Sequence, residues 1–242
     1  MIKINCDIGE RGPDNAIDKE LMCYVQIANI ACGGHAGDVE SVRAFRELAR
    51  EFNVAVSGHL SYPDRENFGR VSMDMPIEQL LASLTEQHEM MSDIKMIKFH
   101  GALYNDACIN KNLSGALAAW LSTNGITEII TPAGSELAKR CAELNIKVIP
   151  EAFAERAYSY SPETGQLSLV NRSKDYACIH DCETAVANTD QILNKKQVNA
   201  YVEEVDGSVS RRKIPIEAET VCIHSDSDIS LELAKRLSSL ND

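Results

Sequence analysis

Side chains capable of chemistry recur at or just beyond the short apolar runs of this sequence. They are Asp7, Glu10, Asn29, His35, Asp38, His59, Lys98, His100, His224 and Asp226. Four of the six histidines belong to this set. Such residues can bind a divalent metal through imidazole and carboxylate, or they can act as general acids and bases on a small substrate. Their spacing leaves both alternatives open.

Each of these residues, taken alone, has a structural explanation. Asp38 can cap a helix and Asp7 can stabilise a turn. Their common placement argues for a site, because the carboxyl ends of parallel strands surround the active site in α/β folds. We therefore expect the four histidines of the set to lie close together.

Three further groups of polar residues have alternatives that stay open. Tyr62, Asp64 and Arg70, in the segment SYPDRENFGR, can orient a substrate or pack a loop. His88 lies within a helical stretch, where we expect a solvated face. His180 and Asp181 precede a helix, where a capping role and a site role are equally compatible with the sequence.

Apolar, β-branched runs alternate with stretches of helical period, which predicts an α/β fold with parallel strands and crossover helices. The expected strands are residues 2–6, 26–31, 54–58, 96–99, 128–131, 147–150, 177–179 and 220–223. The expected helices are residues 38–52, 76–93, 113–123, 135–144, 183–194 and 228–240. Asp38 suits the start of the first helix, and Pro76 suits the first turn of the second.

Two segments lack a helical stripe. Residues 158–175 contain Pro162 and Gly165 and predict a long loop or a small hairpin. Residues 198–212 predict extended segments around a turn at Asp206 and Gly207. No repeat or linker interrupts the 242 residues, so we expect a single domain over 1–242.

The composition limits the classes of partner. Hydrophobic residues make up 44% and charged residues 25%, which is typical of a globular chain. The formal net charge of −12 opposes binding to nucleic acid and to anionic membranes. The start MIKINCDIGE matches neither a secretory signal nor a membrane span, so we expect a cytoplasmic protein. The sequence leaves a homo-oligomer open.

Cysteine and glycine patterns add no cofactor site of their own. The eight cysteines are scattered, and we expect free thiols, most of them buried. The sequence contains no GxxxxGK[ST] loop, and CGGHAGD lacks the glycine spacing of a dinucleotide-binding turn. The glycines at 33, 34 and 37 are better explained by a tight turn.

Eight ordered motifs run nearly end to end: INCDIGE, NIACGGHAGD, GHLSYPDRENFGR, KFHGALYN, PAGSELA, EAFAERAY, LVNRS and VCIHSDS. In these motifs and their order the sequence resembles the LamB/YcsF family. The resemblance implies an irregular (β/α) barrel of about seven parallel strands, related to the polysaccharide deacetylase and glycoside hydrolase/deacetylase barrels. It also implies ATP-coupled opening of 5-oxoproline to L-glutamate, with Mg²⁺ alongside ATP, in a complex with two further subunits, B and C.

The resemblance also marks site residues. The catalytic candidates are Asp7, His35, His59, Lys98 and His100. The candidates for substrate binding are Glu10, Asn29, Asp38, Tyr62, Asp64, Tyr104, Arg156, His224 and Asp226, with Glu155 and Arg172 as additions. Four positions beside them depart from the family's common wording: Leu60, Ser61, Phe99 and Ser225.

In the resulting hypothesis, partner subunits phosphorylate the lactam and this chain hydrolyses the product. Asp7 or one of the histidines activates water, Lys98 neutralises negative charge, and Tyr104 and Asn29 orient the substrate. One alternative is a metal-dependent amide hydrolase or deacetylase that needs no ATP, with Asp7, His35 and His59 as ligands. Another is a non-catalytic subunit that binds a small carboxylate.

Overall fold

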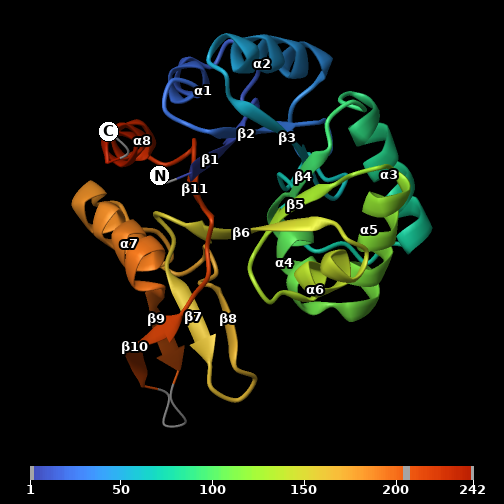
Figure 1. Ribbon diagram of the computed structural model, residues 1–242. Coiled ribbons are helices and arrows are strands. Elements are labelled where there is room, and N and C mark those ends of the chain that lie inside the picture. The colour runs from blue at the N-terminus through green and yellow to red at the C-terminus, as the bar shows by residue number, and fades with distance from the viewer. Residues whose placement is uncertain (1–2, 204–207, 241–242) are drawn as a thin grey trace.

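The computed structural model describes residues 3–203 and 208–240, and its centre is a closed barrel of parallel strands (Figure 1). The barrel strands are β1 (Lys3–Ile8), β2 (Ile27–Ala31), β3 (Ala55–Leu60), β4 (Met96–Phe99), β5 (Glu128–Thr131), β6 (Lys147–Phe153) and β11 (Thr220–His224). Their order around the barrel is β1-β11-β6-β5-β4-β3-β2. The predicted α/β class and the barrel of seven parallel strands are confirmed. The expected relation to polysaccharide deacetylases stays a prediction.

The barrel strands read as nearly continuous apolar runs because both of their faces are buried. In β2 all five residues are buried, and in β1 every residue after Lys3 is buried. Registers such as Asp7 with Asn29 and Asp7 with His224 place polar side chains of neighbouring strands at one level of the barrel. The carboxyl ends of the strands therefore gather the residues that the sequence analysis singled out.

Helices cover the outside of the barrel in the part of the chain that the structure describes (Figure 1). They are α1 (Ala16–Leu21), α2 (Val39–Glu51), α3 (Ile77–Glu89), α4 (Gly101–Ile109), α5 (Lys111–Thr123), α6 (Glu136–Glu143), α7 (Cys182–Lys195) and α8 (Ser230–Ser239). All six predicted helices are confirmed. Helices α1 and α4 were not predicted: α1 has only six residues, and α4 follows β4 without an intervening loop.

A second sheet lies beside the barrel and is formed by β7 (Tyr158–Ser161), β8 (Gln166–Leu169), β9 (Gln197–Glu203) and β10 (Val209–Pro215), in the order β10-β9-β7-β8. The hairpin alternative for 158–175 is confirmed by the antiparallel pair β7 and β8. The antiparallel pair β9 and β10 confirms the second extended segment, whose predicted turn at Asp206 and Gly207 lies outside the described residues. Figure 1 shows this sheet projecting away from the ring of helices.

The predicted strand at 177–179 is wrong. Cys178 forms only an isolated bridge with Arg156, and the segment leads into α7 instead of extending a sheet. A run of three apolar residues does not distinguish a strand from a buried loop.

Among the described residues, no helix has the length and apolar character needed to cross a bilayer. All eight cysteines are free, and Cys23 is exposed.

Candidate active site

A cleft of about 1340 Å³ opens at the carboxyl ends of the barrel strands. Its floor includes the side chains of Asp7, Glu10, His59, Lys98, His100, Tyr104, Glu151 and His224, most of which lie at or just beyond strand ends. Nine of the fourteen site residues marked in the sequence line this cleft: Asp7, Glu10, His59, Lys98, His100, Tyr104, Arg156, His224 and Asp226. His35 and Asn29 lie behind them and contact lining residues.

The deepest feature of the cleft is a buried ammonium held between two carboxylates. Lys98 Nζ lies 3.0 Å from Asp7 Oδ1 and 2.8 Å from Glu151 Oε1, and its side chain is 3% exposed. Burial acts to lower the pKa of Lys98, but the charge of Asp7 and its other acidic neighbours outweighs burial and raises the pKa well above its usual value. Lys98 is therefore a fixed positive charge and not a nucleophile at neutral pH.

Asp7 is held ionised from two sides. Burial acts to raise its pKa, but His59 and Lys98 outweigh burial and hold the pKa well below its usual range. The amide of Asn29 donates a hydrogen bond of 2.9 Å to Asp7 Oδ1. A second bond from Asn29, of 2.8 Å, reaches Asn5, so the amide fixes the orientation of the carboxylate.

Glu151 was missed in the sequence. It lies inside the apolar strand β6 and is 2% exposed. Its Oε2 accepts a 2.7 Å hydrogen bond from Tyr104 Oη while Oε1 faces Lys98. A charged residue within an otherwise apolar strand was the available signal, because an unpaired carboxylate would be costly there.

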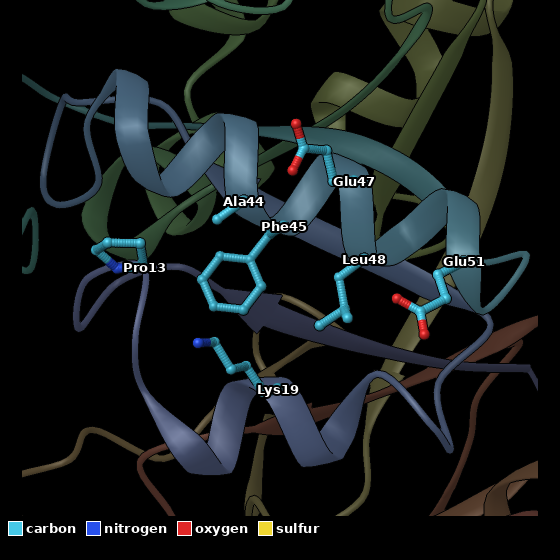
Figure 2. A pocket seen from close by; sticks show the side chains of 7 residues that line it. All are labelled: Pro13, Lys19, Ala44, Phe45, Glu47, Leu48 and Glu51. Atoms are coloured by element: carbon cyan, nitrogen blue, oxygen red, sulfur yellow. The ribbon is translucent and has the colours of Figure 1, made fainter.

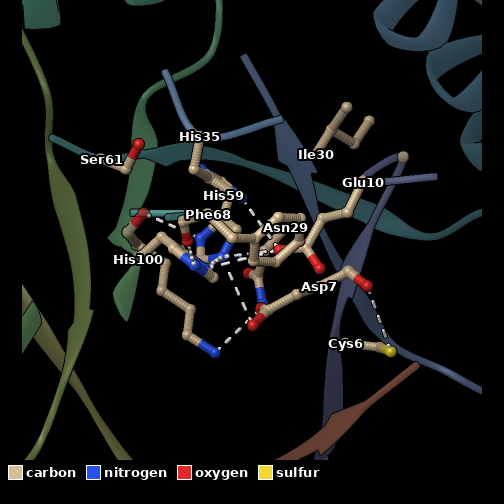
Figure 3. A network of polar contacts seen from close by, with 12 residues as sticks. Cys6, Asp7, Glu10, Asn29, Ile30, His35, His59, Ser61, Phe68 and His100 are labelled. Carbon is tan, nitrogen blue, oxygen red and sulfur yellow. Dashed lines mark hydrogen bonds and ion pairs between the residues drawn. The ribbon is translucent and has the colours of Figure 1, made fainter. Parts of the chain in front are cut away.

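Three imidazoles gather beside these carboxylates (Figure 3). His59 Nε2 and His100 Nδ1 are 3.0 Å apart. The opposite nitrogens face backbone carbonyls, with His59 Nδ1 at 3.2 Å from Lys98 O and His100 Nε2 at 3.0 Å from Phe68 O. A carbonyl oxygen only accepts, so these two nitrogens carry the protons. In neutral rings the facing nitrogens are then both acceptors.

The carboxylate of Glu10 lies beside the three imidazoles. Its Oε1 lies 2.9 Å from His35 Nε2, 3.4 Å from His100 Nδ1 and 3.8 Å from His59 Nε2. The rings of His35 and His100 stack in parallel planes with centroids 3.7 Å apart. Burial, reinforced by the neighbouring imidazoles, lowers the pKa of both His35 and His100 well below the usual value. Both rings are therefore neutral at neutral pH.

The loop before α3 closes over the imidazoles. The ring of Phe68 makes edge contacts with His35 and His100, at centroid distances of 5.2 and 5.4 Å. Gly69 has a φ of +63°, and a Cβ there would lie 2.9 Å from His35 Cβ and 3.1 Å from His100 Cδ2. Only glycine therefore allows this close approach without displacing the histidines.

Two further polar contacts lie beside the cleft. His224 Nδ1 lies 2.6 Å from Glu155 Oε1, and the same oxygen accepts a bond from the His224 backbone N–H. Asp226 Oδ2 is 2.9 Å from Arg70 and 3.6 Å from Arg172. Asp226 and its two arginines therefore place charged groups of both signs along the cleft.

Besides His35 and Asn29, three of the fourteen marked residues do not line the cleft: Asp38, Tyr62 and Asp64. Asp38 is exposed and accepts a bond from Ser41 N as the N-cap of α2. Tyr62 donates to Asp106, and Asp64 accepts bonds from Asn67 within its own loop. A fourth residue, Arg156, reaches the cleft but donates to the carbonyls of Ala177 and Val170. The geometry assigns these four side chains to local structure.

His88, His180 and His224 lie outside the cluster of His35, His59 and His100, so the expectation that four histidines lie close together is met by only three. His88 is 6% exposed, so the expected solvated face is wrong: its Nε2 donates to Ile94 O and its ring packs edge-on against Trp120. At the start of α7 the cap is Asp181, not His180.

A second, smaller hollow of about 260 Å³ lies outside the barrel between α1 and α2 (Figure 2). Lys19, Phe45, Leu48 and Glu51 are among its lining residues. It is lined by none of the imidazoles and by none of the carboxylates of the cleft, so we do not assign it to the site.

A closed parallel barrel with buried acids, imidazoles and a lysine at the carboxyl ends of its strands has the architecture of a (β/α)-barrel enzyme site. The LamB/YcsF family profile matches residues 2–241. The chain belongs to the LamB/YcsF family.

Named relatives cover nearly the whole chain. The A subunit of 5-oxoprolinase from Haemophilus influenzae strain PittEE is 34% identical over 245 residues, which cover 98% of this chain and 94% of that protein. The same protein of strain PittGG is also 34% identical with the same coverage. The lactam utilization protein from Thermus thermophilus has a crystal structure with a TM-score of 0.80, 26% identity, and coverage of 98% of this chain and 94% of that one.

A more distant structure shares the fold alone. The GH20 catalytic module of pneumococcal StrH is 10% identical, with a TM-score of 0.51 and coverage of 99% of this chain and 84% of that one.

Proposed function

We propose that this chain is the A subunit of an ATP-dependent 5-oxoprolinase and performs the hydrolytic part of opening 5-oxoproline to L-glutamate. The names of relatives that match nearly the whole chain supply the substrate. The observation that carries the proposal is the convergence of Asp7, Lys98, His59 and His100 at the floor of one cleft. Its volume of about 1340 Å³ exceeds that of a typical small-ligand pocket, about 300–1,000 Å³, and accommodates a phosphorylated substrate.

The reaction sets clear demands on such a site. A lactam is a stable amide, and phosphorylation of its oxygen by ATP makes the ring carbon a better electrophile. Water then adds to that carbon, and the bond to the ring nitrogen breaks as the nitrogen takes up a proton. The resulting acyl phosphate takes a second water and gives glutamate and inorganic phosphate.

The residues at the floor match these demands. Asp7 and the neutral imidazole of His100 can accept the proton of the attacking water. His59, 3.0 Å from His100, can pass a proton on toward the ring nitrogen. Lys98 supplies a fixed positive charge for the oxygen on which negative charge develops.

The proposal assigns phosphorylation to partner subunits B and C, with ATP and Mg²⁺ bound there. It is motivated by the sequence, which contains no GxxxxGK[ST] loop. It also places the complex in the cytoplasm, where ATP is available.

The test is glutamate release from 5-oxoproline by the purified chain, with and without ATP and the two partner subunits. Release only when all are present supports the proposal. Stoichiometric ATP hydrolysis and glutamate release by the chain alone would refute the division of labour. Retained partner assembly with lost turnover in an Asp7→Ala variant would exclude a purely ligand-binding role.

A second candidate is a metal-dependent amide hydrolase, and the facing acceptor nitrogens of His59 and His100 favour it. Glutamate release without ATP that is abolished by a chelator would establish this function in place of the first.

A further inference from the structure

The facing nitrogens of His59 and His100 and the carboxylate of Glu10 are arranged like the ligands of a metal ion. In neutral rings both nitrogens present lone pairs to each other at 3.0 Å, and Glu10 Oε1 lies 3.4 and 3.8 Å from them. Such an arrangement is unfavourable unless a positive charge lies between the groups.

The distances fit one ion. For metal bonds of about 2.0–2.1 Å in a tetrahedral site, two ligand atoms lie about 3.4 Å apart. The three separations among His59 Nε2, His100 Nδ1 and Glu10 Oε1, from 3.0 to 3.8 Å, bracket that value. The planes of His59 and His100 are inclined by 88°, so one ion can lie near both planes.

Each of the three groups also has the outer hydrogen bond that metal ligands have. The second nitrogen of His59 donates to Lys98 O, and that of His100 donates to Phe68 O. Glu10 accepts from His35 Nε2. Backbone carbonyls that fix the tautomer of a ligating histidine, and donors that hold a ligating carboxylate, are typical of such sites.

His35 belongs to this outer set and not to the ligands. Its ring is parallel to that of His100, with an interplanar angle of 1° and centroids 3.7 Å apart. A single ion cannot lie in the planes of two parallel rings. The ligand set therefore differs from the Asp7, His35 and His59 set considered from the sequence.

The charge balance points the same way. Asp7 and Glu151 share the buried ammonium of Lys98, whereas the third carboxylate, Glu10, contacts the imidazoles. A cation held between the imidazoles would offset the charge of Glu10 and would lie near Asp7 as well, whose Oδ2 is 3.3 Å from His59 Nε2.

We propose that Glu10, His59 and His100 bind one divalent transition metal ion, with the fourth position open to the cleft. Two imidazoles and one carboxylate favour a zinc-like or iron-like ion over Mg²⁺, which prefers oxygen ligands. Because all three residues line the cleft, a bound ion meets the substrate space directly. Metal binding at these residues does not depend on the proposed reaction.

The test is metal binding by the full-length chain after chelator treatment and dialysis, with Zn²⁺ or Co²⁺ as the only added ion. We expect one bound equivalent by elemental analysis and by titration calorimetry. His59→Asn and His100→Asn are expected to lower the affinity about 100-fold or more, and His35→Asn about 10- to 100-fold. Circular dichroism shows whether each variant is folded.

Two control variants make the result specific. His180→Asn removes a histidine outside the cluster and leaves binding unchanged. His224→Asn tests the alternative group of Asp7, Cys222 and His224, whose ligand atoms also lie within 4.8 Å of one another. Loss of binding in that variant, or a thiolate charge-transfer band with Co²⁺, would overturn the proposed ligand set.

If the folded wild-type chain binds no equivalent of metal, the proposed site is wrong. The short distance between His59 and His100 would then be explained by a proton shared between the two nitrogens. Neither result changes the outcome of the glutamate assay, so the two proposals fail separately.

Discussion

Replacing Lys98 by methionine removes the buried ammonium and keeps a similar side-chain volume. Lys98 lies 3.0 Å from Asp7 and 2.8 Å from Glu151, and its side chain is 3% exposed. Removing one partner of a buried ion pair costs about 3–5 kcal/mol because the remaining charge is uncompensated. For a chain of this size that corresponds to a fall in Tm of roughly 6–20 °C.

The loss depends on pH with a definite sign. In the wild-type protein the pKa of Asp7 is held below its unfolded value, so the pair contributes stability above about pH 4, and this is lost as pH falls through the folded pKa. In Lys98→Met the pKa of Asp7 rises because the cation is gone. The difference in unfolding free energy is therefore largest at neutral pH and shrinks toward pH 4.

The assay is urea unfolding followed by circular dichroism at about pH 7 and about pH 4.5, on either side of the window in which the Asp7 carboxyl of the variant takes up its proton. Lys147→Met is the matched control, because Lys147 pairs with Glu128 at 2.7 Å but is 60% exposed. We expect the control to change stability by no more than about 1 kcal/mol. A loss below about 1 kcal/mol for Lys98→Met at neutral pH, or an equal loss at both pH values, would refute the reasoning.

Two other substitutions separate site residues from local structure. Tyr104→Phe removes the buried 2.7 Å hydrogen bond to Glu151. We expect the unfolding free energy, measured by urea titration, to fall by about 1.5–3 kcal/mol. An unchanged urea midpoint would show that this hydrogen bond is not formed. Asp38→Ala removes the N-cap of α2 and should lower the unfolding free energy by about 1 kcal/mol. The rate of glutamate release by the reconstituted complex should stay within about twofold of the wild-type rate. A larger fall in this rate would show that Asp38 belongs to the substrate-binding residues.

Apolar periodicity predicted the α/β class and the positions of the strands because it follows burial, whereas the barrel was implied by the family resemblance. All seven barrel strands were located, including β4 and β5 with their observed bounds. Helix α4 was missed because it begins directly after His100, whose side chain makes no capping hydrogen bond, so the sequence has no typical N-cap residue there. The short run 177–179 was mistaken for a strand because local pattern does not reveal whether a sheet edge is available for pairing.

Within the site, polar residues in or just beyond the predicted strands were a good but incomplete guide. His59 and His100 were found because they follow predicted strands and Lys98 because it lies within one, whereas Glu151, directly after the strand expected at 147–150, was not marked. Its role depends on Lys98 and Tyr104, which are distant in sequence, and only the closed barrel brings them together. Tyr62, in contrast, was marked by a motif, and its hydroxyl contacts Asp106 and not the cleft.

The most direct test of the central claim is the rate of glutamate release from 5-oxoproline by the complex reconstituted with Asp7→Asn. This variant keeps the shape of the side chain and removes the carboxylate that contacts both Lys98 and His59. The exposed Asp14→Asn is the matched control. We predict a rate at least about 100-fold lower for Asp7→Asn, with folding and partner binding retained, and no change for the control. A rate within about twofold of the wild type would contradict the account.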